Sequence, residues 1–339
     1  MSSQPALLCA LNDFEKADFF PPDLWSRLQR MPFQFNDLAL PLTNCRQLPD
    51  YLHDAGAEVL VSCWATPPLP EDLPVGGSGQ LRYVCHLAGS VKSLVPRSLI
   101  ERGLKVTNWG GSVSRTVSEC ALLLILASLR RASAWTIAMH QNGAWKDKYA
   151  VVTESLFGRT VGLHGFGAIA RELVPLLRPF GVNILAHSPS VSAETFARYG
   201  VRKCATLEEI FSESDIVVEL APATPQTYRV VDETMLRLIR PGGVFVNVGR
   251  GSVVDEDALA RVAAEGEIQV GLDVYDVEPL PADSPLRRLP NVMLLPHLGG
   301  PTKDRRRDCG KFGVDNLDRY LNGEPLVSEV TLEIYDRAT

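Results

Sequence analysis

A glycine-rich stretch, placed between a short apolar run and a helical pattern, constrains the fold of this chain more than any other feature. The stretch is Thr160-Val-Gly-Leu-His-Gly-Phe-Gly-Ala-Ile-Ala170, in which Gly165, Gly167 and Ala170 have the spacing G-x-G-x-x-G/A. Its first residues predict a buried strand, and apolar residues at helical spacing continue to Phe180. This order of strand, glycine turn and helix indicates the first half of a βαβ unit.

Each of these small residues has a physical role. Gly165 permits the tight turn, Gly167 lets a pyrophosphate approach the backbone, and Ala170 lets the helix pack closely on the strand. The N–H groups and the dipole of the new helix then attract the anion. A further apolar run at residues 182–187 completes the unit. The pattern therefore predicts dinucleotide binding, and a tight turn without any ligand is the alternative.

Length and charge set the frame for the rest of the chain. The 339 residues predict two domains, and 45% hydrophobic with 22% charged residues is ordinary for a globular protein. A net charge of −6 with interspersed signs disfavours a nucleic-acid or membrane partner. The most apolar run, Ala121–Ala127, is too short to cross a bilayer. We expect no signal peptide, because no basic segment precedes an apolar core at the N-terminus.

The seven cysteines are scattered, and none forms a C-x-x-C pair. This usage is typical of reduced thiols in the cytoplasm, and it predicts no metal site.

Apolar runs alternate with helical patterns along most of the chain, which predicts α/β architecture with doubly wound parallel sheets. A nearly all-apolar helix, expected from Val117 onward, should be buried between two domains or two subunits. The expected strands are 6–11, 58–63, 82–86, 105–107, 160–163, 182–187, 215–220, 244–248, 269–274 and 292–295. The other expected helices are 22–31, 98–102 (the end of one), 168–180, 206–212, 232–238, 256–265 and 306–321.

Three side chains follow strands of the second set. Arg250 comes after residues 244–248, Glu278 comes after the next strand, and His297 comes after the last one. Because ligands of open α/β sheets bind outside the carboxyl ends of the strands, all three should lie at the edge that carries the glycine loop. Arg can hold a carboxylate through a bidentate fork, and a Glu beside a His favours the imidazolium. Taken singly, His297 also fits a structural histidine, Arg250 a residue of a solvated loop, and Glu278 an exposed turn residue.

Four ordered stretches resemble the D-isomer-specific 2-hydroxyacid dehydrogenase family, and the resemblance extends from Val84 to Val327. They are Gly158–Ala170, Asn247–Leu259, Gly271–Leu280 and Pro296–Thr302. The resemblance implies a Rossmann nucleotide domain (109–296) inserted into a flavodoxin-like substrate domain (1–108 and 297–339). It also implies a homodimer that pairs through the nucleotide domain, which together with the cysteine usage gives a cytoplasmic homodimer as the expectation.

The resemblance further implies that Arg250, Glu278 and His297 are catalytic and that the Ala88–Gly89 backbone binds the substrate carboxylate. Trp64, after a strand of the first domain, is a candidate pocket residue or a packing aromatic. We predict that the cofactor contacts eleven residues, with Asp273 at its nicotinamide end. They are Gly165, Phe166, Gly167, Ala168, Ile169, Ser188, Ala221, Pro222, Val248, Gly249 and Asp273.

Three departures from the family pattern bear on these assignments. The usual Gly-x-Gly before the carboxylate loop is replaced by Cys85-His-Leu-Ala-Gly89, and Leu220-Ala-Pro222 lacks the usual histidine. Ser188 stands where NAD enzymes of the family have an aspartate. The expected cofactor is therefore NAD(H), with NADP(H) not excluded.

Together these features predict an NAD(P)-dependent oxidoreductase that interconverts a small D-2-hydroxy acid and its 2-keto acid, as glyoxylate and hydroxypyruvate reductases do. A dinucleotide-sensing regulatory protein of the co-repressor kind is the alternative outside enzymes. Formate dehydrogenase is the alternative within them, and Glu278 speaks against it because that branch pairs its histidine with glutamine.

Overall fold

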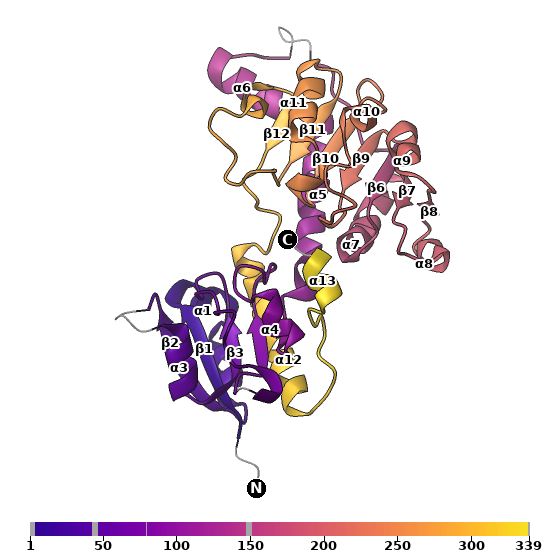
Figure 1. Cartoon of the computed structure of the whole chain (residues 1–339). Coiled ribbons are helices and arrows are strands. Elements are labelled where there is room, and N and C mark those ends of the chain that lie inside the picture. The colour runs from indigo at the N-terminus through magenta and orange to yellow at the C-terminus, as the bar shows by residue number, and fades with distance from the viewer. Residues whose placement is uncertain (1–3, 43–46, 79, 147–150, 338–339) are drawn as a thin grey trace. The chain divides into compact units, whose positions relative to one another are not determined.

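The structure is a computed structural model, and it describes residues 4–42, 47–78, 80–146 and 151–337. The chain forms two compact units (Figure 1). The first unit contains the residues up to Val113 together with those from Pro301 onward, and the second is Ser114–Gly300. His297 thus belongs to the second unit. The predicted assignment of a nucleotide and a substrate role to whole domains stays a prediction at this point.

The described residues of the first unit form a parallel sheet of strand order β2-β1-β3-β4-β5. This is the order of flavodoxin-like sheets. The strands are β1 (Ala6–Asn12), β2 (Gln34–Leu40), β3 (Ala57–Ser62), β4 (Tyr83–His86) and β5 (Lys105–Thr107). The helices are α1 (Asp13–Phe19), α2 (Pro22–Arg30), α3 (Leu48–Asp54), α4 (Arg97–Glu101), α12 (Arg306–Leu321) and α13 (Leu332–Arg337).

Helix α12 brings the C-terminal part of the chain back onto the first sheet, as expected. It packs against α1, α2 and β4. Gly310 is required here, since a methyl group at this position would lie 1.9 Å from the carbonyl oxygen of Phe19.

The described residues of the second unit form a parallel sheet of order β12-β11-β10-β9-β6-β7-β8, flanked by helices (Figure 1). Counted within the unit, this is the Rossmann order 3-2-1-4-5-6 with one more strand added. The strands are β6 (Thr160–His164), β7 (Asn183–His187), β8 (Arg202–Lys203), β9 (Ile216–Glu219), β10 (Val244–Asn247), β11 (Gln269–Leu272) and β12 (Val292–Leu294). The helices are α5 (Ser114–Leu129), α6 (Ala132–Asn142), α7 (Ala168–Leu177), α8 (Ala193–Arg198), α9 (Leu207–Glu213), α10 (Glu233–Leu236) and α11 (Glu256–Ala264).

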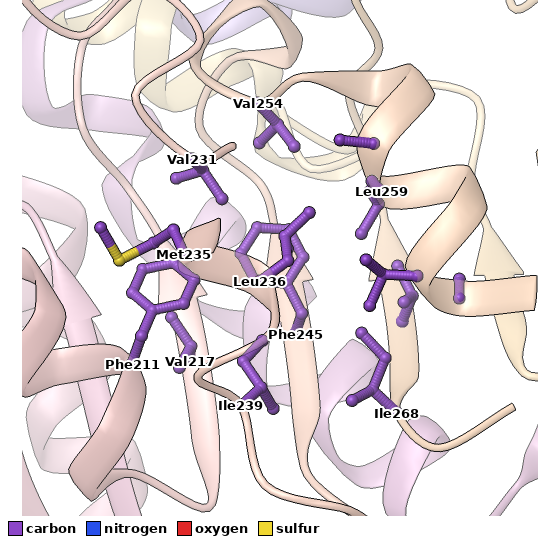
Figure 2. Packing of buried hydrophobic residues seen from close by; sticks show 14 of the residues in the cluster. Phe211, Val217, Val231, Met235, Leu236, Ile239, Phe245, Val254, Leu259 and Ile268 are labelled. Atoms are coloured by element: carbon purple, nitrogen blue, oxygen red, sulfur yellow. The ribbon is translucent and has the colours of Figure 1, made fainter. Parts of the chain in front are cut away.

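The core on one face of this sheet is dry and aliphatic, with aromatic rings from helix and strand (Figure 2). Buried side chains of α9, α10 and α11 meet the strands there, and burial of this kind contributes about 25 cal/mol per Å² of apolar surface. The labelled members are Phe211, Val217, Val231, Met235, Leu236, Ile239, Phe245, Val254, Leu259 and Ile268.

The long apolar helix α5 begins at Ser114, a turn earlier than predicted, and it packs against α7 and strands β10 and β11. In the described chain, the helical stretch Gly110–Leu129 has the length and mean hydropathy (1.4) of a membrane span. More than half of that stretch, 56%, is buried within the protein, which is also how the core helix of a globular protein behaves. Leu123 on its outer side is exposed.

The fold class predicted from the sequence is confirmed, and the differences concern short elements. The prediction lacks strands β2 and β8 and helices α1, α3, α8 and α13, and it gives no bounds for α6. Strand β2 lies at the edge of its sheet, where Leu40 is its one buried residue, so it has no continuous apolar run. Strand β8 has two exposed residues and gives no pattern. The predicted thiol at Cys45 lies outside the described residues, and the other cysteines are free and buried.

Candidate active site

The carboxyl ends of the strands of the second unit meet at one edge, and β6 lies next to β9 although strands β7 and β8 come between them in the chain. Such a neighbour pair marks the point where the strand order reverses, and open α/β sheets bind ligands in the crevice there. The glycine loop follows β6 directly, so the sheet places it at this reversal point.

Two glycines of the loop are present for different reasons. Gly165 has a φ of +95°, and a methyl group on it would lie 2.9 Å from the carbonyl oxygen of Leu220, so the chain itself requires glycine there. Gly167 has a φ of −81°, and a methyl group on it would meet no atom within 4 Å. Nothing in the described chain demands glycine at this second position. The open space in front of Gly167, at the N-terminus of α7, therefore fits the diphosphate of a dinucleotide.

The rest of the loop refines the predicted cofactor contacts. Ala170 is fully buried, as close packing of α7 on the sheet requires. The Phe166 ring is also fully buried and stacks on Phe196 with centroids 4.6 Å apart. The predicted contact of Phe166 with the cofactor is therefore limited to its backbone. Ala168 begins α7 and is exposed, and Ile169 is half-buried behind it.

The remaining cofactor candidates follow the neighbouring strands. Ser188 comes directly after β7 and is half-buried, and Ala221 and Pro222 come after β9. Val248 and Gly249 come after β10, and a methyl group on Gly249 would lie 3.1 Å from the carbonyl oxygen of Glu219. The structure thus brings these positions to the same edge, and their contacts with a cofactor stay predictions.

Arg250 lies in a loop that is held by Asn247. The Asn247 side chain accepts the Gly249 N–H at 3.0 Å and donates to the Arg250 carbonyl oxygen at 3.1 Å. The guanidinium donates to the Gly249 carbonyl oxygen at 2.7 Å. Burial lowers the pKa of Arg250, and the charge of Glu278 opposes that shift, so this carboxylate acts on the guanidinium. Arginine remains charged under all ordinary conditions.

His297 and Glu278 form a pair, with Nδ1 and Oε2 2.6 Å apart. The other oxygen of Glu278 accepts the Tyr275 N–H at 3.0 Å, which fixes the carboxylate against its own loop. The pair is partly open to solvent, at 49% for the His297 side chain and 35% for that of Glu278. The carboxylate orients the imidazole ring through its Nδ1 atom.

The backbone at His297 is in the left-handed region, with a φ of 54°. Asp273 holds it there from both sides. The Asp273 carbonyl oxygen accepts the His297 N–H at 3.0 Å, and its carboxylate accepts the N–H groups of Leu298 at 2.6 Å and Gly299 at 2.8 Å. Asp273 thus positions the catalytic candidate, and its predicted contact with the nicotinamide stays a prediction.

The substrate candidates of the first unit form a separate group. Ala88 is buried and Gly89 is half-buried, and their carbonyl oxygens accept the Trp109 N–H at 3.1 Å and the Asn108 side chain at 2.7 Å. A methyl group on Gly89 would lie 2.6 Å from the Trp109 ring, so a larger residue does not fit there. Trp64 is half exposed, at 53%, and meets Trp109 edge to face.

Some residues near these candidates were not predicted from the sequence. Arg306 of α12 stacks on the Trp64 ring at 5.2 Å and pairs with Asp18 at 2.6 Å, and nothing in the sequence indicates this contact. His164, at the end of β6, pairs with the fully buried Glu219 of β9. The available signal for this pair was an ionisable residue at the end of each otherwise apolar strand. Among the described residues, no three His, Cys, Asp or Glu side chains are placed to hold a metal ion.

Comparison with known proteins identifies the class of enzyme. The profile of the D-isomer specific 2-hydroxyacid dehydrogenase NAD binding domain matches residues 122–299. Glyoxylate/hydroxypyruvate reductase B of Pectobacterium carotovorum is 36% identical over 234 residues, which are 67% of this chain and 72% of the relative. Glyoxylate reductase of Thermococcus gammatolerans is 32% identical over 269 residues, 75% of this chain and 78% of the relative.

A solved structure has the same fold over nearly the full length. The apo form of Rhodotorula graminis D-mandelate dehydrogenase superposes with a TM-score of 0.80 at 25% identity, covering 96% of this chain and 97% of that one. The residues that the NAD-binding-domain profile matches, 122–299, lie within the second unit. The chain belongs to the D-isomer-specific 2-hydroxyacid dehydrogenase family, and it is an NAD-dependent enzyme of that family. The predictions of family, enzyme class and NAD are confirmed.

Proposed function

We propose that this enzyme reduces a small 2-keto acid of the glyoxylate or hydroxypyruvate type to the D-2-hydroxy acid. The observation that carries the proposal is the pairing of His297 with Glu278 at 2.6 Å, in a loop system whose third charged member is Arg250. An acid–base pair beside a carboxylate-binding cation, next to a dinucleotide loop, is the equipment for hydride transfer to a keto acid. The names of the relatives support the choice of substrate.

The residues then have distinct tasks. The glycine loop and Ser188 hold the dinucleotide, which supplies the hydride when it is bound. Arg250 binds the substrate carboxylate and polarises the carbonyl group. His297, as the imidazolium, donates a proton to the carbonyl oxygen, and Glu278 keeps Nδ1 protonated and the ring oriented. In the oxidation direction, neutral His297 accepts the hydroxyl proton.

Ala88, Gly89 and Trp64 remain our candidate substrate contacts from the first unit. The aromatic surface of Trp64 supports a role in selecting the substituent of the acid, since it is half exposed. NADP(H) stays open as a second cofactor.

A homodimer is also part of the proposal. Apolar side chains are exposed on α5, on α6 and in the segment after α6, and exposed apolar surface of this kind favours a protein partner. These residues are Leu123, Ile137, Met139 and Trp145. Light scattering during size-exclusion chromatography tests it. The buried, free cysteines fit a reducing compartment, which supports a cytoplasmic enzyme.

The test of the function is a substrate screen. Purified protein is assayed with glyoxylate, hydroxypyruvate and bulkier 2-keto acids, each with NADH and with NADPH. We expect turnover of at least one small acid. Glycolate, the product from glyoxylate, is achiral, so chiral analysis is made on the product of hydroxypyruvate or of a bulkier acid, which should be the D-isomer. Protein that binds NADH but turns over none of these acids would contradict the proposal and favour the dinucleotide-sensing alternative.

A further inference from the structure

A row of ionisable side chains lies across the carboxyl ends of three neighbouring strands, under the glycine loop. His164 of β6 is in register with Glu219 of β9 on one side and with His187 of β7 on the other. Glu219 is fully buried and His164 is 6% exposed. The reaction proposed above uses none of these residues.

The carboxylate of Glu219 joins two loops of the cofactor edge. Its Oε2 atom lies 2.5 Å from Nδ1 of His164, and its Oε1 atom accepts the Ala221 N–H at 2.7 Å. His164 directly precedes Gly165, so one bond of this carboxylate leads to the glycine loop and the other to the loop after β9. The Leu220 N–H also donates to the His164 carbonyl oxygen, at 2.9 Å. The pair therefore fixes how the two loops meet.

The charge of the pair depends on one proton. Burial lowers the pKa of His164, but the charge of Glu219 and the hydrogen bond to it outweigh that effect, so that the pKa lies above its ordinary value. With the proton, a buried anion and a buried cation cancel. Without it, one uncompensated negative charge remains, and a charge buried in this way is costly.

Among the described residues, the charged group that shifts the pKa of His164 is Glu219, and the ring of His187 lies beside that of His164 with centroids 6.2 Å apart. His187 turns its Nδ1 atom to the Cys204 carbonyl oxygen at 3.3 Å. The cation in hydrogen-bond contact with the Glu219 carboxylate is therefore the protonated His164.

We propose that the His164–Glu219 pair is a proton-dependent positioning element of the dinucleotide site, which favours the bound diphosphate only while His164 is protonated. The inference rests on the proposed placement of the cofactor at the glycine loop. Loss of the proton leaves the charge of the Glu219 carboxylate uncompensated, next to the residue that precedes Gly165, and this charge repels the diphosphate. NADH affinity should therefore fall as the pH rises through the pKa of His164, by roughly tenfold for a partly screened charge at this range.

The experiment measures the dissociation constant of NADH by fluorescence titration of the protein without substrate, between pH 6.5 and pH 10. In wild type we expect the constant to rise roughly tenfold. Glu219→Gln keeps an acceptor for the Ala221 N–H but has no charge, so its constant should stay low and independent of pH. His164→Gln keeps the buried carboxylate without its cation, so its constant should be high and independent of pH.

His187→Gln is the matched control, because it removes the neighbouring imidazole and leaves the pair intact. Its pH dependence should follow wild type. A wild-type constant that does not change with pH would overturn the inference. The inference is also overturned if Glu219→Gln and His164→Gln keep the wild-type pH dependence of the NADH dissociation constant. It is overturned as well if that pH dependence disappears in His187→Gln.

A further variant separates this inference from the proposed site. Gly167→Asp has room for its side chain and an ordinary backbone, so it should fold and repel the diphosphate. If Gly167→Asp binds NADH like wild type, the placement of the cofactor at the glycine loop is wrong. If it loses binding while Glu219→Gln keeps the wild-type slope, only the role of the His164–Glu219 pair is wrong.

Discussion

The second unit contains two histidine–glutamate pairs of nearly identical geometry and opposite surroundings. His297 and Glu278 are 2.6 Å apart and half open to solvent, whereas His164 and Glu219 are 2.5 Å apart and enclosed at the head of the glycine loop. Both pairs join an imidazole Nδ1 atom to a carboxylate at the carboxyl end of the same sheet. Distance alone therefore does not separate a catalytic pair from a structural one.

What separates them is the exposure of the two side chains. In the proposed reaction, the exposed pair exchanges a proton with the substrate and with water in every turnover. The enclosed pair is shielded from substrate, so its proton acts on stability and on the charge of the site. The comparison teaches that exposure decides which task the same two side chains perform.

The largest effect should come from breaking the exposed pair. His297→Asn removes the acid–base group, and we expect kcat on the best keto acid to fall by about 10²–10⁴-fold. NADH binding without substrate should stay within a few-fold of wild type. Steady-state kinetics and NADH titration check both. A decrease of less than fivefold in kcat would exclude His297 from the mechanism.

Breaking the enclosed pair should affect folding instead. His164→Leu leaves the Glu219 carboxylate buried without a cation, which should cost about 3–5 kcal/mol in the free energy of unfolding. The double variant His164→Leu/Glu219→Leu removes both charges and should recover most of that loss. Urea denaturation of the three proteins measures it. A double variant no more stable than His164→Leu would show that shape rather than charge matters here.

The enclosed pair also predicts how stability depends on pH. Because the pKa of His164 is raised in the folded protein above 6.5, the stabilisation is complete below about pH 6.5 and is lost as the pH rises through the folded value. Wild type should therefore lose stability relative to Glu219→Gln on going from pH 6.5 to pH 9. Urea midpoints at both values test this, and equal changes in the two proteins would argue against an ionised pair.

A smaller effect is expected from changing Arg250, which acts with His297 and Glu278 in the proposed reaction. Arg250→Lys keeps the charge but loses the planar fork that matches a carboxylate, so we expect kcat/KM to fall roughly 10- to 100-fold. An increase in KM for the keto acid would show that the fork binds the ground state. Unchanged kcat and KM would mean that Arg250 only braces its loop.

The smallest effect concerns the cofactor. Ser188 has no charge to repel a 2′-phosphate, and the next four residues contain no Arg or Lys to attract one. We expect kcat/KM with NADH and NADPH to differ by less than roughly 100-fold, which is about 2.7 kcal/mol. Ser188→Asp should shift the ratio toward NADH by adding repulsion. A wild-type preference above about 1,000-fold would show that another group reads the ribose.

The sequence alone predicted the parallel sheets well, because their central strands are unbroken apolar runs. The same argument fails for β2, which lies at the edge of its sheet and alternates exposed with half-buried residues. Arg250, Glu278 and His297 could be predicted as a group because each follows its own strand, and parallel strands end at one edge.

The pairing of His164 with Glu219 could not be predicted in this way. The two residues are 55 positions apart, and their contact depends on β6 lying beside β9, which chain order does not reveal. His164 also directly precedes Gly165 in a motif that is defined by its small residues and carries no requirement at position 164. The left-handed backbone at His297 and the clamp by Asp273 likewise arise only from the folded loops.

That left-handed backbone has a consequence for how such an enzyme could change during evolution. Histidine, asparagine and glycine accept a φ of 54° readily, whereas a β-branched residue would strain it. The Asp273 carboxylate accepts hydrogen bonds from the backbone N–H groups of Leu298 and Gly299, so these bonds persist whatever side chain occupies position 297. A replacement by asparagine can therefore silence the chemistry and preserve the shape. A descendant of this fold could keep binding its cofactor as a sensor long after it has ceased to be a catalyst.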